Sequence, residues 1–232
     1  MVTPDYFDLR GVSQDAYGSV LVPPYVRANL PDDRNESILD FGCGFGQLLR
    51  GLNDLGYHSV FGADVSKTAI SHCRGLGLPI FDTNDDDWLD SERDRYSLIV
   101  VSHVLEHIEK GEIVPTLAKL RTLLKAGGSL VVAVPNAQSH TGAYWAYEDF
   151  THTTLFTSGS IQYVLRAAGF SSIQFLDIDC TLGLPPPKRL LRKWLLGAYR
   201  ANYQFWNRVT ASYTHTPSPA IFSYEIKVLA RS

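Results

Sequence analysis

The stretch ILDFGCGFG, from Ile38 to Gly46, decides how this chain folds. An apolar run of strand length contains Asp40 and is followed by three glycines in five positions. Glycines at the carboxyl end of a parallel strand allow a ligand to approach the backbone closely. The next residues, GQLLRGLNDLG (46–56), carry leucines at helical spacing. The stretch therefore predicts a strand, a ligand-binding loop and a helix.

Apolar runs of strand length alternate with helical patterns along the rest of the chain. Near-continuous apolar strands joined by helices indicate a parallel sheet that is covered on both faces. A long passage precedes the final strand, which we expect to enter as an antiparallel edge. The predicted fold is α/β: a doubly wound, Rossmann-like sheet of seven strands, six parallel and the last antiparallel, with helices on both faces. Strands are expected at 37–41, 58–64, 78–82, 96–103, 128–135, 171–179 and 220–232, and helices at 46–56, 66–77, 113–128 and 158–170, with a further helix around 18–30.

The composition is that of a soluble globular protein, with 232 residues, 45% hydrophobic and 19% charged. A net charge of -3 argues against general affinity for nucleic acid. Three scattered cysteines, Cys43, Cys73 and Cys180, are too few for a disulfide framework or a zinc site. The amino terminus MVTPDYFDLR lacks a secretion signal, and no apolar run approaches the ~20 residues of a membrane span. We therefore expect a cytoplasmic protein.

The ligand of the glycine loop is indicated by two carboxylates. Asp64 ends the next strand, 22 residues after Gly42, where it is placed to accept the hydroxyls of a ribose. A dinucleotide fits poorly, because Gln47 stands where its fingerprint needs the third glycine and Asp40 would repel a pyrophosphate. A ligand with a ribose, a positively charged end and no phosphate fits better, and S-adenosylmethionine is such a ligand. The alternative is an ordinary tight turn.

Four stretches resemble motifs of the class I S-adenosylmethionine-dependent methyltransferases: ILDFGCGFGQLL, FGADVS, YSLIVVSHVLEHI and LLKAGGSLVVAVPN. The resemblance covers about residues 36–178. It implies that residues 1–35 form an N-terminal helical cap segment. Residues 36–232 would form the methyltransferase domain, with acceptor-side insertions at about 135–156 and 184–215.

The same resemblance implies a set of cofactor-binding residues. Asp40 and the loop would hold the methionine end, and Asp64 the ribose. An adenine contact is expected in the acidic run FDTNDDDWL, at Asp82, Asp85 or Asp86, and Trp88 is either a cover for the adenine or a core residue. The full set implied is Asp40, Gly42, Cys43, Gly44, Gly46, Asp64, Val65, Asp82, Asp85, Ser102 and His103.

A first histidine cluster, SHVLEH (102–107), follows the fourth predicted strand at the ligand-binding edge. His107 is a candidate general base, since histidine suits proton transfer near neutral pH. Some quinone-pathway relatives hold a divalent metal at this place, and His103, Glu106 and His107 are the alternative metal ligands. In a third reading Glu106 and His107 only anchor the loop by hydrogen bonds.

A second cluster, YEDFTHTTLFT (147–157), follows the fifth predicted strand. His152 is the other candidate base, or a residue that orients the acceptor. This stretch and the helix after it resemble a pattern of bacterial methyltransferases that modify sugars, often those of surface polysaccharides. Aromatic faces stack on sugar rings, which favours acceptor binding by the residues nearby, although packing under a loop is the alternative. The acceptor-binding candidates are Tyr144, Trp145, Tyr147 and Asp149.

The segment PPPKRLLRKWLLGAYRANYQFWNRV interleaves basic residues with leucine and tryptophan and contains no acidic residue. Four readings of residues 188–208 stay open: a lid over an anionic acceptor, an amphipathic helix on an anionic membrane, a dimer-forming helix, and a solvated helix with a core-facing stripe.

The sequence thus predicts a methyltransferase that uses S-adenosylmethionine to methylate an oxygen of a sugar or glycan intermediate, at a hydroxyl or a phosphate, in surface polysaccharide biosynthesis. The acceptor would be a small molecule or glycan, anionic or lipid-linked. One alternative is a phenolic or quinone-like acceptor with metal assistance, and another is a non-catalytic binding protein on the same fold. The sequence makes no prediction of the oligomeric state.

Overall fold

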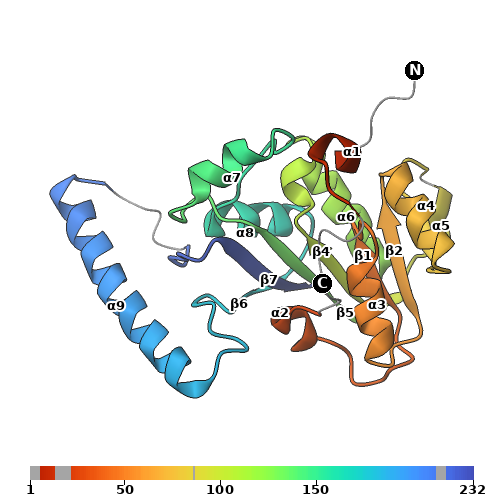
Figure 1. The fold of residues 1–232 in the computed structure, drawn as a ribbon, viewed down its shortest axis with the longest axis horizontal. Helices are drawn as coiled ribbons and strands as arrows, with labels where there is room; N and C mark the ends of the chain where they lie inside the picture. The colour runs from red at the N-terminus through yellow and green to blue at the C-terminus, as the bar shows by residue number, and fades with distance from the viewer. Residues whose placement is uncertain (1–5, 14–21, 86, 213–217) are drawn as a thin grey trace.

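The computed structural model describes residues 6–13, 22–85, 87–212 and 218–232 (Figure 1). In that part of the chain seven strands form one sheet in the order β3-β2-β1-β4-β5-β7-β6. Strand β7 runs antiparallel to the other six, which are parallel to one another. The predicted doubly wound fold is therefore confirmed. The strands are β1 (Ile38–Phe41), β2 (Val60–Asp64), β3 (Ile80–Asp82), β4 (Tyr96–Ser102), β5 (Leu124–Pro135), β6 (Ser172–Leu176) and β7 (Glu225–Arg231).

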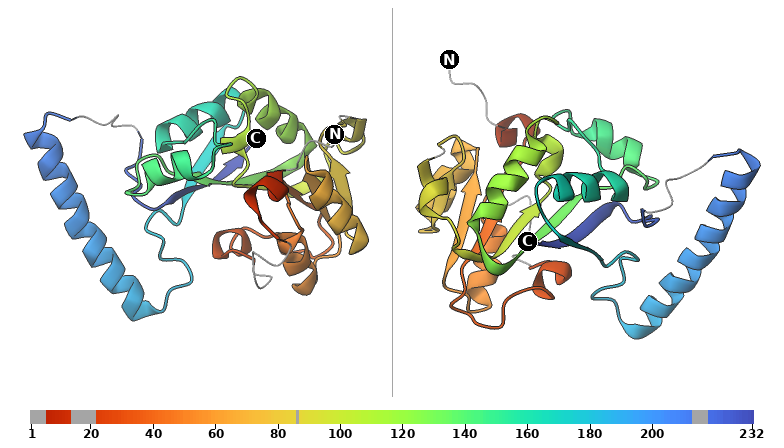
Figure 2. Two further views of the ribbon diagram at one scale, coloured as in Figure 1. Left: turned by 45° about the horizontal axis from the view of Figure 1, so that its top comes forward. Right: turned by 180° about the vertical axis from the view of Figure 1, so that it is seen from behind.

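Helices connect these strands and cover both faces of the sheet (Figure 2). Side chains alternate between faces along a strand, so Leu39 and Ile99 pack with α6 and α8 while Ile38 and Val100 pack with α2 and α3. The helices are α1 (Tyr6–Arg10), α2 (Pro24–Arg27), α3 (Gln47–Asp54), α4 (Lys67–Gly75), α5 (Asp87–Ser91), the 3₁₀ turn η1 (Leu105–His107), α6 (Ile113–Leu123), α7 (Gly142–Glu148), α8 (Ser158–Ala167) and α9 (Pro186–Val209).

The strand order reverses between β1 and β4, and ligands of doubly wound sheets bind where this reversal occurs. The glycine loop and the chain after β4 both leave the carboxyl edge of the sheet at this point. Glu225 lies at the same edge, because the antiparallel β7 pairs Glu225 with Pro135 at the end of β5. The topology thus gathers residues 40–46, 64, 102–107 and 225 around one edge.

Two details differ from the sequence expectation at the β4–β5 pair and at β7. The helix expected over 113–128 ends at Leu123, and β5 begins at Leu124, because Gly127 takes a φ of 77° and the pairing with β4 shifts register there. Strand β7 lies between β5 and β6 and is not an edge strand. All its residues except Arg231 are buried, so it packs as an interior strand.

The amino-terminal segment is described only in part. Of the helix expected around 18–30, α2 accounts for Pro24–Arg27, whereas residues 18–21 lie outside the described part of the chain.

Candidate active site

The glycine loop turns tightly from β1 into α3. Gly42 has a φ of 80°, and a Cβ on it would lie 2.2 Å from Cγ2 of Val104, in the segment after β4. The Gly42 N–H donates to the carbonyl of Ala63 in β2, at 2.7 Å. No other residue fits this conformation and this space. Gly42 therefore holds the loop against the ends of the neighbouring strands.

Asp64 is buried and joins the glycine loop to β2. Its carboxylate accepts the N–H of Gly44 at 2.8 Å through Oδ2 and the N–H of Ser66 at 2.9 Å through Oδ1. The predicted ribose carboxylate thus also organises the loop beside which the ribose would lie.

Asp40 is buried close to Asp64. Burial, together with repulsion from Asp64, raises the pKa of Asp40 to about 7. A nearby cation would favour the carboxylate form and offset the unfavourable burial of its charge. Two buried carboxyl groups beside the loop suit a ligand with a positive end and disfavour a pyrophosphate.

The predicted adenine-side residues lie at the ends of β2 and β3. Asp82 pairs in register with Asp64, and its Oδ1 accepts both the backbone and side-chain N–H of Asn84, at 2.9 and 2.8 Å. Asp85 is exposed, as is Val65, which follows β2. Asp86 lies outside the described residues. Of the acidic candidates, Asp82 is thus the one aligned with Asp64.

Trp88 packs at the edge of the hydrophobic core. Its ring stacks on Phe81 with centroids 4.8 Å apart and planes 11° apart. Both rings pack against the hydrophobic cluster that includes Leu39 and Ile99. This position corresponds to the core alternative for Trp88.

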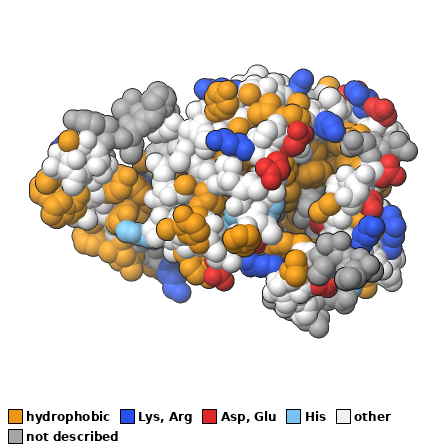
Figure 3. All heavy atoms as spheres, turned by 90° about the horizontal axis from the view of Figure 1, so that it is seen from above, with side chains coloured by type: hydrophobic (Ala, Val, Ile, Leu, Met, Phe, Trp, Pro, Cys, Tyr) orange, Lys and Arg blue, Asp and Glu red, His pale blue; other side chains and the backbone are white. Residues whose placement is uncertain are grey.

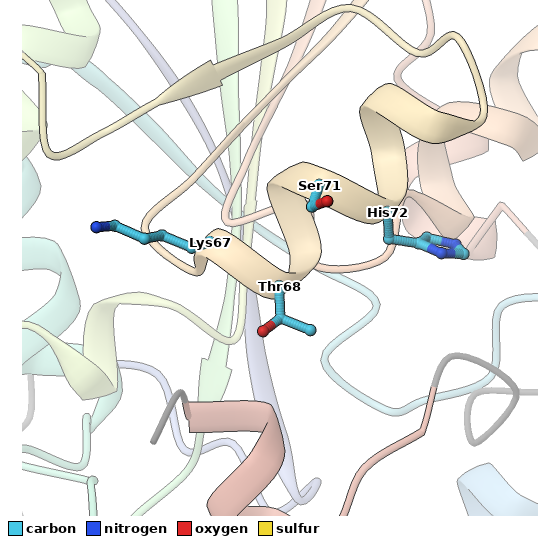
Figure 4. A pocket seen from close by; sticks show the side chains of 4 residues that line it. All are labelled: Lys67, Thr68, Ser71 and His72. Carbon is cyan, nitrogen blue, oxygen red and sulfur yellow. The ribbon is translucent and has the colours of Figure 1, made fainter. Parts of the chain in front are cut away.

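A shallow depression opens beside α4 and is lined by Lys67, Thr68, Ser71 and His72 (Figure 4). His72 contacts the ring of Phe45 in the glycine loop, with centroids 5.4 Å apart. The depression thus lies on the helix that follows Asp64 in the chain.

His103 sits at the end of β4 in a left-handed conformation, with a φ of 55°. Its Nε2 lies 3.1 Å from Glu225 and its Nδ1 3.3 Å from Glu106. Burial alone would lower the pKa of His103, but the two carboxylates outweigh it and raise that pKa to about 9. The preceding residue, Ser102, lies 3.1 Å from the hydroxyl of Tyr25 through its Oγ. His103 is therefore held as a cation by two buried carboxylates.

Glu106 is fully buried, and neither of its carboxylate oxygens makes a hydrogen bond with the described residues. The 3.3 Å approach of His103 is an ion pair without hydrogen-bond alignment. Buried carboxylates are normally paired, because desolvation of an unpaired charge is costly. The carboxylate of Glu106 thus retains free coordination capacity inside the site.

His107 and His152 form a ring pair with centroids 4.7 Å apart. The Thr151 hydroxyl donates to Oδ1 of Asp149 at 2.7 Å, so its oxygen accepts the Nδ1–H of His107, also at 2.7 Å. The Nδ1 of His152 donates to the carbonyl of Trp145 at 2.6 Å. With Nδ1–H donating in this way, the Nε2 of His107 carries the lone pair, whereas the Nε2 of His152 lies 3.9 Å from Oδ2 of Asp149. Burial lowers the pKa of His107, so this ring is neutral near pH 7.

Glu106, His107 and His152 each offer a ligand atom, and these atoms lie within 4.8 Å of one another. The predicted metal ligands were His103, Glu106 and His107. The structure brings His152 into this group, whereas His103 is engaged by Glu106 and Glu225.

Asp149 is buried and bonds to residues that contact the histidines. It accepts hydrogen bonds from the Tyr6 hydroxyl at 2.8 Å and from Thr151, and pairs with Arg10 at 2.9 Å. Burial opposes the charged form, but these partners outweigh it and lower the pKa of Asp149 to about 2. Its carboxylate is therefore engaged by Tyr6, Thr151 and Arg10, and its role in acceptor binding stays a prediction.

Helix α1 bridges the two halves of the site. Phe7 is buried against Phe45 of the glycine loop, with ring centroids 4.6 Å apart. Tyr6 contacts the ring of His107, with centroids 5.4 Å apart. Arg10 adds the ion pair with Asp149. The helix thus touches both the loop and the histidine pair.

The predicted acceptor-binding aromatics lie on α7. Tyr144 and Tyr147 are exposed, and Trp145 is half-buried and packs edge-on against Tyr144. The exposed ring of Phe150 follows them. The alternative of aromatic packing under the loop thus applies to Trp145, while the other rings present free faces.

Three residues of the site escaped the sequence analysis: Tyr6, Arg10 and Glu225. Tyr6 and Arg10 are distant in sequence from every motif. Glu225 carries one signal, an acidic residue two positions before Lys227 in a strand whose other residues up to Ala230 are apolar.

A family model described as a methyltransferase domain matches residues 18–174. No curated protein is similar enough in sequence to give a match.

Several solved structures share the fold. A SAM-dependent methyltransferase from Archaeoglobus fulgidus is 17% identical with a TM-score of 0.61, over 85% of this chain and 86% of that one. An S-adenosylmethionine-dependent methyltransferase from Mesorhizobium loti is also 17% identical, with a TM-score of 0.57 over 95% and 98%. Phosphoethanolamine N-methyltransferase 2 from Haemonchus contortus, in complex with S-adenosyl-L-methionine, is 14% identical with a TM-score of 0.61, over 99% of this chain and 60% of that one. At these identities the likeness establishes the fold.

Proposed function

Because the chain belongs to the methyltransferase domain family and is an enzyme that uses S-adenosylmethionine, we propose that it methylates an oxygen of a sugar or glycan intermediate. The proposal that oxygen is the methylated atom rests on His107. This histidine is neutral, and its Nε2 lies at the carboxyl edge of the sheet. A hydroxyl acceptor needs a base, whereas an acceptor that is already an anion does not.

The residues present suit the cofactor. Asp40 would face its positively charged methionine end, and Asp64 would accept its ribose hydroxyls beside the glycine loop. Asp82 would extend the same edge toward the adenine. S-adenosylmethionine supplies the methyl group from its sulfonium, and the acceptor oxygen forms the new bond to carbon as the bond from sulfur breaks.

His107 would take the acceptor proton at Nε2. Two consecutive hydrogen bonds, from His107 Nδ1 to Thr151 and from Thr151 to Asp149, hold the Nδ1 proton in place and stabilise the imidazolium that forms. General bases contribute ~10²–10⁴-fold to a rate. His152 would orient the acceptor, because its ring packs edge-on against that of His107.

A sugar ring fits the surface next to these histidines. Tyr144, Tyr147 and Phe150 expose aromatic faces, and such faces favour the apolar face of a sugar. The acceptor would be a nucleotide sugar, a sugar phosphate or a lipid-linked glycan, as in the assembly of surface polysaccharides.

The test measures release of the demethylated cofactor with two acceptor panels: nucleotide sugars and sugar phosphates, and catechols and quinols. The proposal expects turnover with the first panel. His107→Ala should lower kcat by ~10²-fold or more and leave cofactor affinity unchanged, with the smaller effect in KM. His58→Ala, at an exposed position just before β2 and therefore at the opposite edge of the sheet, is the matched control and should keep full kcat. Turnover confined to the second panel, or full kcat in His107→Ala, would contradict the proposal.

A second candidate is metal-assisted methylation of a phenolic or quinone-like acceptor. It is favoured by the unbonded carboxylate of Glu106 beside His107 and His152. Two imidazoles and a carboxylate suit a divalent transition metal or zinc, which would polarise the acceptor oxygen. In that case the Thr151 and Trp145 contacts would fix the ligand tautomers.

Chelation separates the two candidates. If activity is lost with a chelator and restored by a divalent ion, and if Glu106→Gln abolishes that restoration, the metal candidate holds. If activity is unchanged by chelation while His107→Ala lowers kcat, His107 acts as the base.

A further inference from the structure

Helix α9 is the longest helix of the described chain, yet it contains no buried residue. It stands apart from the body of the molecule between β6 and β7 (Figures 1 and 2). Large apolar residues are usually buried, and an exposed cluster of them marks an interaction site. Seven such side chains of α9 are each more than half exposed: Leu190, Leu191, Trp194, Leu195, Phe205, Trp206 and Val209.

One face of α9 contacts the body. Tyr199 and Tyr203 each pack against Phe222 with centroids 5.1 Å apart, and Tyr199 also meets His140 at 5.0 Å. Arg200 pairs with Asp179 at 2.8 Å. At 3.6 residues per turn these positions share one side of the helix. The contact face is thus aromatic, with one ion pair.

The opposite face is apolar and points away from the body. Leu190, Leu191, Trp194, Phe205 and Val209 fall on it at helical spacing, and the end of the molecule formed by α9 is covered by apolar side chains on the left of Figure 3. An apolar face turned outward does not close over the site, so the lid reading does not account for it.

Basic residues border this apolar face on both sides. Lys188 falls along one border, and Lys193 and Arg208 along the other, while Arg189 and Arg192 fall on the side of the body contacts. No acidic residue occurs between Cys180 and Glu225. Cations that flank an apolar face with tryptophans are the pattern of helices that lie in the surface of an anionic bilayer.

We infer that α9 docks this protein on an anionic lipid surface, with its apolar face in the acyl boundary and the flanking cations at the headgroups. A second copy of the chain fits less well, because pairing the same faces would bring two sets of flanking cations together without an acidic partner on either helix. In the described chain no helix combines the length and apolar character needed to cross a bilayer, so α9 lies on the surface. The inference goes beyond the proposed function and does not depend on the acceptor.

The experiment measures flotation of the full chain with phosphatidylcholine vesicles, with and without one quarter phosphatidylglycerol. Binding should be at least ~10-fold tighter to the anionic vesicles and should weaken with salt. The double variant Trp194→Gln/Phe205→Gln should lose at least ~10-fold of that binding while retaining cofactor affinity, which shows that it is folded. Tyr163→Gln, which removes an exposed ring from α8, is the matched control and should bind as the parent does.

Three results would overturn the inference. The chain could fail to float with anionic vesicles, or the double variant could bind them unchanged. Light scattering could instead show a dimer that the double variant abolishes, with no vesicle binding, and the face would then be an interface between copies. Failure of the acceptor assay would leave the flotation result as it stands, so the two proposals are tested separately.

Discussion

Replacing Asp40 with Asn should stabilise the cofactor-free protein, and more so at high pH. The pKa of Asp40 rises from 3.8 to about 7 on folding, because the carboxyl group is buried near Asp64. Folding is therefore favoured while the group is protonated, and this stability is lost as the pH rises from about 4 through 7. The difference between 7 and 3.8, at about 1.36 kcal/mol per pH unit, is about 4 kcal/mol in full.

Between pH 5 and pH 8 the titration of Asp40 lowers the free energy of unfolding of the wild-type protein by about 2.5 kcal/mol. The same pH change has no such effect in Asp40→Asn. The assay is denaturant unfolding of both proteins at the two pH values, since their difference cancels every other titrating group. Asp90→Asn, an exposed aspartate, is the control for loss of one negative charge. An Asp40→Asn effect that is equal at pH 5 and pH 8 would refute the reasoning.

Four further outcomes follow from the site. Cofactor binding at pH 6 should release close to one proton in the wild type and none in Asp40→Asn, which calorimetry in two buffers of different ionisation heat detects; equal release would implicate another group. Asp64→Ala should weaken cofactor binding by ~1.5–3 kcal/mol in calorimetry, and unchanged affinity would remove it from the ribose site. Gly42→Ala should lower the unfolding free energy by ~2 kcal/mol or more, whereas Gly111→Ala, with open space around it, should change it by less than ~0.5. Thr151→Val should lower kcat ~10-fold with Thr151→Ser near normal, and equal rates would show that the hydroxyl does not fix the His107 tautomer.

The sheet could be predicted because its central strands, such as β4, are buried on both faces and appear in the sequence as near-continuous apolar runs. The proximity of Asp40 and Asp64 followed from the same logic, since adjacent parallel strands end at one edge. The position of β7 did not follow, because the order of strands in a sheet is set by long-range packing.

The histidine site was predicted only in its parts. His107 and His152 each stood in a recognisable cluster, but their contact joins segments 45 residues apart, and no local pattern specifies it. The roles of Thr151 and Glu225 depend on hydrogen bonds and ion pairs that exist only in the folded chain. The sequence identifies the reactive groups, whereas neighbouring residues in the folded chain determine the tautomers and charges of those groups.

Helix α1 links the two walls of the candidate active site. Its Phe7 lies on the glycine loop and its Tyr6 and Arg10 on the acceptor side, so one five-residue element contacts both walls. A ligand that shifts the helix at one wall changes the contacts at the other, and by reciprocity each ligand alters the affinity for the other by the same factor. If the cofactor lies against the loop and the acceptor against the histidines, the release of either one would depend on whether the contacts of α1 with Phe45 and Asp149 hold.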